Sequence, residues 1–201
     1  MKIYDKDIRP ILYDKISNLK EFTSDNTSII IDEFPVVEGS ARVDIAVVNG
    51  KLHGFEIKSE QDTLDRLSDQ IFFYNMVFDK MTLVVSEKFK DKLINIIPKW
   101  WGIYYIKTVG NKPKLVVEKK SKLNKDIKIE AFLSLLWRNE MLELLLSNNI
   151  KKGVKSKNKE DLTQIIIKNF SFNEIKNFTR LKLKTRNIER AVLVSKLCDD
   201  L

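Results

Sequence analysis

The sequence predicts an α/β protein: a mixed sheet flanked by helices, followed by an all-helical C-terminal part. Up to residue 120, short β-branched runs bounded by Gly, Asn and Pro alternate with segments of helical period. From residue 121 onward the apolar period is helical to the end. Hydrophobic residues make up 43% of the 201, which is enough to bury a core. We therefore expect two domains, residues 1–120 and 121–201.

The first domain is expected to be built from strands and helices in alternation. Residues 7–22 are typical of an amphipathic helix with Asp7 as its N-cap. A strand and then a hairpin follow, and after them a helix, a strand, a helix ended by Pro98, and two further strands. In that order, the expected segments are 28–34, 42–48, 51–58, 62–78, 81–86, 87–97, 100–107 and 112–120.

The second domain is expected to hold four helices. The first runs from about residue 126 to 147, and a basic loop separates it from the second at 160–170. Ser171 and Glu174 have the spacing of a capping box that opens a third helix. Residues 185–197 are expected to form the fourth.

Charge is distributed unevenly along the chain. The formal net charge is +8, with 19 basic and 18 acidic residues in 1–120 but 17 and 10 in 121–201. This excess indicates a surface that binds a polyanion, with a solvated Lys-rich face as the plain alternative. No apolar run is long enough to cross a membrane, and the first ten residues lack the layout of a signal peptide. We therefore expect a cytoplasmic protein with no membrane partner.

Cysteine and histidine usage narrows the chemistry. The chain has one cysteine, Cys198, and one histidine, His53, which excludes a disulfide framework, a CxxC zinc site and a two-histidine site. Any metal site must therefore be built from carboxylates, which favours Mg²⁺ or Mn²⁺ as cofactor. His53 alternates along its expected strand in step with the apolar residues Phe55 and Ile57. We therefore expect its side chain to lie in the core or at the end of the strand.

The block ARVDIAVVNGKLHGFEIKSE, residues 41–60, carries the functional signal. If the apolar odd-numbered residues of both strands share the buried face, Asp44, Glu56 and Lys58 converge on the other face. Two neighbouring carboxylates are typical of a Mg²⁺ site, and the amine beside them can stabilise charge on a phosphate. The alternative is an ordinary cross-strand ion pair on an exposed face.

The hairpin loop decides whether this convergence is possible. A two-residue turn at Asn49-Gly50 would place Asp44 and Glu56 on opposite faces. We therefore expect an odd-length loop with Gly50 in the left-handed conformation of a bulge, or a bulge near Gly54. The small residues Ala46 and Gly54 are expected to leave room for a ligand backbone.

Asp44 with Glu56-Ile57-Lys58, on a hairpin after an N-terminal helix and strand, resembles the PD-(D/E)XK nuclease superfamily, whose fold is restriction-endonuclease-like. The helix that follows contains Gln70 and Tyr74, which resemble the QxxxY element of the RecB-like branch. The stretch 33–101 also looks like an uncharacterised bacterial family of that superfamily. Val43 stands where the superfamily name has proline.

The resemblance implies a role for each matching residue. Asp44 and Glu56 would be metal ligands, Ile57 would contribute its carbonyl, and Lys58 would activate or position the attacking water. Gln70 and Tyr74 would support the site or touch the nucleic acid backbone.

The roles of three further residues near this block have more than one interpretation. Glu33 would be an additional acidic ligand, in competition with Glu21, Asp32 and Glu38. Arg42 is a candidate phosphate contact, with an ion-pair partner as the alternative. Arg66 is expected to form an ordinary intrahelical pair with Asp62.

Residues 140–170 resemble, loosely, the SAP-type helix-loop-helix module that binds DNA. Five lysines in and around the loop are candidate phosphate contacts, and the slope of log affinity against log salt would then be roughly −4 to −5 on duplex DNA. They are Lys151, Lys152, Lys155, Lys157 and Lys159.

These expectations combine into one reading: a Mg²⁺-dependent phosphodiesterase acting on DNA, with a basic helical domain that aids binding. A non-catalytic nucleic-acid-binding or adaptor protein on the same scaffold is the alternative, and RNA remains open as substrate. Endo- or exonuclease action and the oligomeric state are left open. A homodimer would suit double-strand cutting, but no heptad pattern calls for one.

Overall fold

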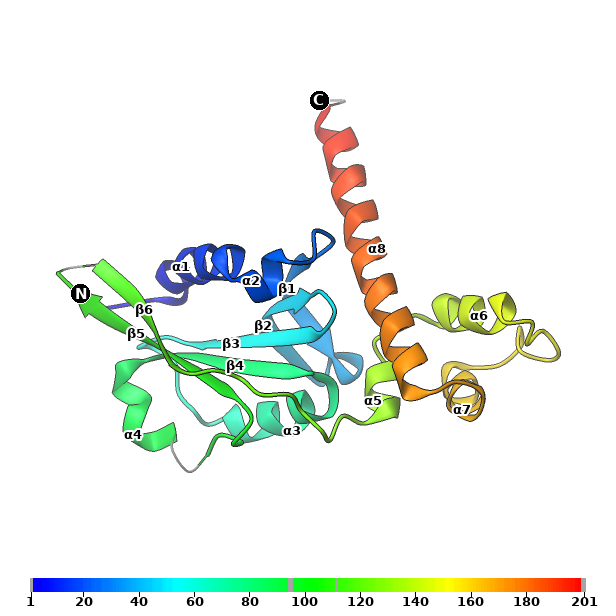
Figure 1. The fold of residues 1–201 in the computed structure, drawn as a ribbon, viewed down its shortest axis with the longest axis horizontal. Coiled ribbons are helices and arrows are strands. Elements are labelled where there is room, and N and C mark those ends of the chain that lie inside the picture. The colour runs from blue at the N-terminus through cyan, green and yellow to red at the C-terminus, as the bar shows by residue number, and fades with distance from the viewer. Residues whose placement is uncertain (1, 94–95, 111, 200–201) are drawn as a thin grey trace. The chain divides into compact units, whose positions relative to one another are not determined.

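The computed structural model describes residues 2–93, 96–110 and 112–199, with side chains omitted at 91 and 187–199. The chain divides into two compact units, Met1–Ile127 and Lys128–Leu201. The first unit is a mixed α/β structure and the second is helical (Figure 1), as the sequence predicts. Among the described residues, no helix combines the length and the apolar character that a bilayer crossing requires.

A six-stranded sheet forms the centre of the first unit, with its strands in sequence order. β3 pairs in parallel with β4, and β4 with β5, while the three other pairs are antiparallel. The strands are β1 (Ile29–Val36), β2 (Ala41–Val48), β3 (Leu52–Lys58), β4 (Lys80–Ser86), β5 (Gly102–Val109) and β6 (Lys112–Lys119).

Helices cover both faces of this sheet (Figure 1). α1 (Asp5–Asn18) and α2 (Lys20–Thr23) lie on one face, where Ile8 and Leu12 join the apolar residues of β2 and β3 in a buried cluster. α3 (Leu67–Val77) and α4 (Lys90–Leu93) lie on the other. The central strands are therefore buried on both faces, as expected of parallel pairing.

Three helices of this unit differ from their predicted bounds. The expected helix 7–22 is broken at Leu19, and its N-cap is Tyr4; Asp7 instead accepts the Tyr4 N–H at 3.0 Å. The expected helix 62–78 begins at Leu67, because the segment before it turns through hydrogen bonds around Ser59. In the expected helix 87–97, a 3-10 turn (Glu87–Phe89) precedes the short α4.

The second unit contains α5 (Ile129–Leu133), α6 (Arg138–Ser147), α7 (Lys159–Asn169) and α8 (Phe172–Asp199). The single helix expected at 126–147 is two helices, because Trp137 is extended and its N–H is accepted by Glu140 at 2.7 Å, which starts a new helix. The third and fourth expected helices are one, since no Gly or Pro interrupts residues 172–199. The capping box between Ser171 and Glu174 is confirmed.

Candidate active site

The β2–β3 hairpin brings the two predicted carboxylates to the same place. Backbone pairing runs from Val48 and Leu52 to Ile45 and Phe55, so the loop has three residues and the odd length is confirmed. The predicted left-handed Gly50 and the alternative bulge near Gly54 are both wrong. Instead, the side chain of Asn49 closes the loop by accepting the Lys51 N–H at 2.8 Å.

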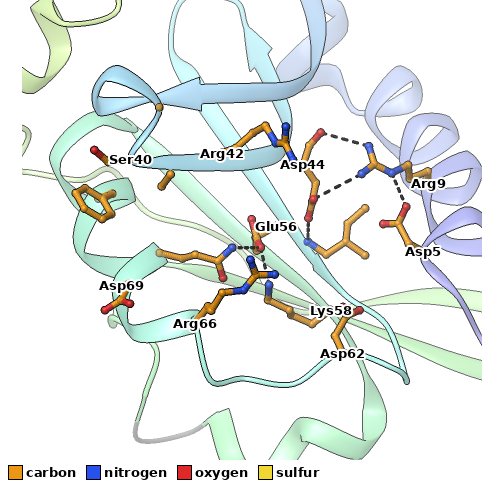
Figure 2. A pocket seen from close by; sticks show the side chains of 15 residues that line it. Asp5, Arg9, Ser40, Arg42, Asp44, Glu56, Lys58, Asp62, Arg66 and Asp69 are labelled. Atoms are coloured by element: carbon orange, nitrogen blue, oxygen red, sulfur yellow. Dashed lines mark hydrogen bonds and ion pairs between the residues drawn. The ribbon is translucent and has the colours of Figure 1, made fainter.

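Beyond the last pair the two strands separate, and the Asp44 carboxylate lies in the gap (Figure 2). Its Oδ2 accepts the Ile57 N–H at 2.6 Å, so a side chain takes the place of the missing strand partner. β2 stays paired with β1 at this point, and β3 with β4. We call this gap between β2 and β3, which begins at Asp44 and Glu56, the fork. It opens the sheet to a ligand where these two carboxylates meet.

Glu56 has hydrogen-bonding contact, through its carboxylate, with three side chains. Its side chain is 3% exposed; Oε1 accepts from Lys58 Nζ at 2.7 Å and from Gln70 Nε2 at 2.6 Å. The Tyr74 hydroxyl lies 2.8 Å from Oε2. The ion pair with Lys58 is buried, and such pairs persist where further hydrogen bonds satisfy both partners. Four predicted residues thus form one connected network.

The surroundings of Asp44 disfavour its charged form. Burial, followed by the Glu56 carboxylate, raises the pKa of Asp44 to about 7, although the Ile57 N–H, Arg9 and Lys58 act in the opposite direction. Carboxylates that disfavour each other's charge are suited to a divalent cation. Asp44 and Glu56 therefore fit a hard ion such as Mg²⁺, whose remaining ligands are commonly water and phosphate oxygens.

No preformed cluster of three or more His, Cys, Asp or Glu side chains suited to a metal occurs in the described part of the chain. The candidate ligand set is therefore limited to two carboxylates and main-chain oxygen. Such sparse sets are usual where Mg²⁺ is bound together with a phosphate substrate.

A pocket of about 500 Å³ opens at the fork. Six of its lining residues were predicted as site residues: Arg42, Asp44, Glu56, Ile57, Lys58 and Gln70. Tyr74 is fully buried beneath them and does not line the pocket, a position that favours support of the site over contact with a phosphate. Residues that the sequence did not assign to the site also line it, among them Asp5, Arg9, Asp62, Arg66 and Asp69.

Glu33 lies to one side of this pocket. It has a φ of 51°, and its two oxygens pair with Arg9 at 2.7 Å and Arg42 at 3.0 Å. Arg9 also lies 3.5 Å from Asp44 Oδ1. Glu33 therefore reaches Asp44 through Arg9, and none of its three competitors, Glu21, Asp32 and Glu38, lines the pocket either.

Arg66 points into the pocket in Figure 2. The predicted pair with Asp62 is absent: Asp62 accepts instead from Ser59, at 2.7 Å from its N–H and 2.6 Å from its hydroxyl. No hydrogen bond or ion pair within the described residues holds the Arg66 guanidinium. A cation in this state is available to an anionic ligand.

Gly54 does not leave room for a ligand, contrary to expectation. A Cβ there would lie 2.4 Å from Met81 Sδ and 3.0 Å from the Phe78 ring. The space beside Gly54 is thus filled by the protein's own core. His53, by contrast, is buried and stacked on Phe55 with ring centroids 4.4 Å apart, which confirms a core histidine.

The five predicted lysines lie in the second unit, between α6 and α7 and at the start of α7. Lys151, Lys152, Lys155 and Lys157 are exposed. Lys159 is half-buried and donates to the Ser134 carbonyl at 2.8 Å. Four of the five are thus open to a polyanion, and the fifth joins two segments of the unit.

The chain is similar to proteins of one described family. The profile of the family described as Bacteriophage P4 protein cII matches residues 8–197. Protein cII of Enterobacteria phage P4 is 28% identical over 167 residues, which are 83% of this chain and 62% of the relative. The chain therefore spans less than two thirds of the length of that relative. A solved protein of unknown function from Silicibacter pomeroyi aligns with 64% of this chain and 85% of its own, with 17% identity and a TM-score of 0.36.

Proposed function

This chain belongs to the bacteriophage P4 protein cII family, and we propose that it is a metal-dependent nuclease that hydrolyses phosphodiester bonds in DNA. The observation that carries the proposal is the meeting of Asp44, Glu56 and Lys58 in one pocket at the β2–β3 fork. In this proposal they are the acidic residues and the lysine of a PD-(D/E)XK motif, with Gln70 and Tyr74 behind Glu56.

Each residue of the motif has a separate role in the proposed reaction. Asp44 and Glu56 would hold Mg²⁺ or Mn²⁺, with the Ile57 carbonyl as a further ligand. When bound, the ion supplies polarisation of a phosphoryl oxygen and a lower pKa of water. Lys58 positions the attacking water and stabilises charge on the phosphate. Hydrolysis transfers the hydroxyl of water to phosphorus and its proton to the departing sugar oxygen.

Cleavage assays test the activity directly. Supercoiled, linear, single-stranded and branched DNA, together with RNA, are incubated with the full chain in Mg²⁺, Mn²⁺ or chelator. We expect cleavage in Mg²⁺ or Mn²⁺ and none in chelator. The cleavage rate is expected to fall at least about 100-fold in Asp44→Asn and in Lys58→Ala, since both remove groups that act at the phosphate. Lys112→Ala is the matched control, because Lys112 is an exposed lysine of β6. Cleavage that survives in Asp44→Asn would contradict the proposal.

Metal binding is tested separately from activity by thermal unfolding. A ligand at about 100 times its Kd stabilises the folded state by about 2.7 kcal/mol. We therefore expect Mn²⁺ to raise the melting temperature of the wild type by several degrees and to leave Asp44→Asn unchanged. Asp69→Asn is the control, since Asp69 lines the pocket but is outside the proposed ligand set.

One observation favours the alternative of a non-catalytic nucleic-acid-binding protein. Both oxygens of Glu56 are already in hydrogen-bonding contact with protein groups, so an ion must share Oε1 with Lys58 and Gln70. Salt-sensitive DNA binding, with neither cleavage nor a metal-dependent melting shift, would support that alternative. The two readings thus differ in both assays.

A further inference from the structure

An exposed tryptophan in the second unit is held as a firm surface. Trp137, the N-cap of α6, is 61% exposed. The Arg186 guanidinium lies over its ring, with Cζ 4.1 Å from the centroid. Arg186 is fixed in turn by Glu140, at 2.6 Å to Oε1, and by the Leu135 carbonyl at 3.0 Å. The indole is therefore supported by a cation–π contact on one side.

The basic loop before α7 is held by Arg138, the residue that follows Trp137. Arg138 Nε donates to the Lys157 carbonyl at 2.9 Å, and its Nη2 to the Lys155 carbonyl at 2.5 Å. Since Arg138 directly follows Trp137, these bonds hold the loop backbone close to the start of α6 where the indole lies. The loop and the indole are parts of one locally fixed surface.

The loop presents cations that are free to meet phosphates. Lys151, Lys152 and Lys155 are exposed, and within the described residues no ion pair holds them. Lys157 pairs with Asp161 at 3.3 Å, but both side chains are nearly half exposed, at 46% and 48%. An exposed pair of this kind contributes little and exchanges readily for a phosphate.

We infer that Trp137 and the lysines of residues 151–157 form a binding site for single-stranded nucleic acid, with an unpaired base stacked on the indole and the backbone phosphates on the loop. A stacking platform beside backbone-binding cations is how proteins hold single strands. A duplex offers phosphates but no free base face, since its bases stack on one another. The inference rests on the proposed function in taking nucleic acid as substrate, and it names the substrate class as one with unpaired bases.

Binding in chelator tests this site without requiring cleavage. Fluorescence anisotropy compares a labelled oligothymidylate of about twenty nucleotides with a blunt-ended duplex of equal total phosphate number, which has no unpaired loop. We expect Trp137→Ala to weaken single-strand binding by roughly tenfold and duplex binding by less than twofold. Leu181→Ala is the matched control, because Leu181 is a 57% exposed apolar residue of α8. Equal weakening for both ligands, or none for the single strand, would overturn the inference.

A second variant covers the case in which Trp137→Ala fails to fold. Trp137→Phe keeps an aromatic ring, so we expect it to keep most single-strand affinity while losing the fluorescence quenching that the oligonucleotide causes in the wild type. Quenching of equal size in Trp137→Phe would place the contact at Trp100, since Trp101 is fully buried, and would refute the site. Because chelator prevents metal-dependent cleavage, absence of nuclease activity and absence of this site give separate results.

Discussion

The Tyr74 hydroxyl lies 2.8 Å from Glu56 Oε2 and 2.6 Å from the Arg42 carbonyl, and so connects α3 to both strands of the fork. The ring is fully buried, with Phe78 and Trp101 as neighbours. Burial and the charge of Glu56 raise the pKa of Tyr74, so its hydroxyl stays protonated and can donate to either oxygen. Tyr74 therefore fixes the position of Glu56 from behind.

Tyr74→Phe tests this relationship. We expect the free energy of unfolding to fall by about 1–2 kcal/mol, because the one buried O–H donor that two oxygens share is lost while the ring packing is kept. Nuclease activity is expected to fall as well, since Glu56 loses its support. Urea unfolding and cleavage rates measure the two effects. Tyr104→Phe is the control, because no hydrogen bond of the Tyr104 hydroxyl occurs among the described residues. Equal effects of the two substitutions would refute a specific role for Tyr74.

Arg66→Ala tests the unpaired cation in the pocket. Arg66 is exposed and unpaired within the described residues, so we expect a change of less than about 0.5 kcal/mol in stability. Binding of a phosphate beside Glu56 and Lys58 would lose a charged donor, and kcat/KM is expected to fall roughly 10-fold or more. Arg66→Lys is expected to recover part of the rate. Lys114→Ala, which removes an exposed charge from β6, is the control, and an equal loss there would point to a general charge effect.

The register of the β2–β3 hairpin could be predicted from the sequence, but the conformation of its loop could not. The alternation of apolar residues requires Asp44 and Glu56 to share a face, and the pairing agrees. Several three-residue loops satisfy that parity, and Asn49 and Gly50 both suit a turn. The hydrogen bond from the Lys51 N–H to Asn49 decided between them, a choice that depends on local geometry and not on pattern.

Contacts between distant segments account for most of what the sequence did not predict. Arg9 reaches Glu33 and Asp44 because α1 packs on the sheet, chiefly against β3 and β6, and nothing in its local sequence indicates a site residue. Gly54 was misread for the same reason: Met81, its partner in the parallel pair of β3 with β4, fills the space beside it. Spacing along the chain does not show which side chains arrive from elsewhere.

Gly54→Ala and Gly50→Ala form a matched pair that tests this packing. The added methyl at Gly54 would lie 2.4 Å from Met81 Sδ, whereas Gly50 has nothing within 4 Å. We expect Gly54→Ala to lower the free energy of unfolding by about 1–3 kcal/mol through overpacking, and Gly50→Ala to change it by less than about 0.5 kcal/mol. Denaturant midpoints of the two variants decide the matter; similar midpoints would show that the core yields beside Gly54.

His53 should make the stability of the first unit depend on pH. Its Nε2 lies 2.9 Å from the Thr82 hydroxyl, and burial, followed by Lys80 and Lys51, lowers its pKa from 6.5 to about 3. The folded state therefore keeps His53 neutral where the unfolded state takes up a proton. Its contribution is fully present above pH 6.5 and is lost as pH falls from 6.5 toward 3, by about 1.4 kcal/mol per pH unit.

The predicted loss between pH 7.5 and pH 5 is roughly 2 kcal/mol from this one residue. His53→Gln removes the titrating group, so the carboxylates that also respond to acid remain the same in both proteins. We therefore expect the unfolding free energy of the wild type to fall by about 2 kcal/mol more than that of His53→Gln over this interval. Urea denaturation at the two pH values measures the difference. Parallel curves for the two proteins would mean that His53 becomes protonated in the folded state, and that the buried ring has access to water.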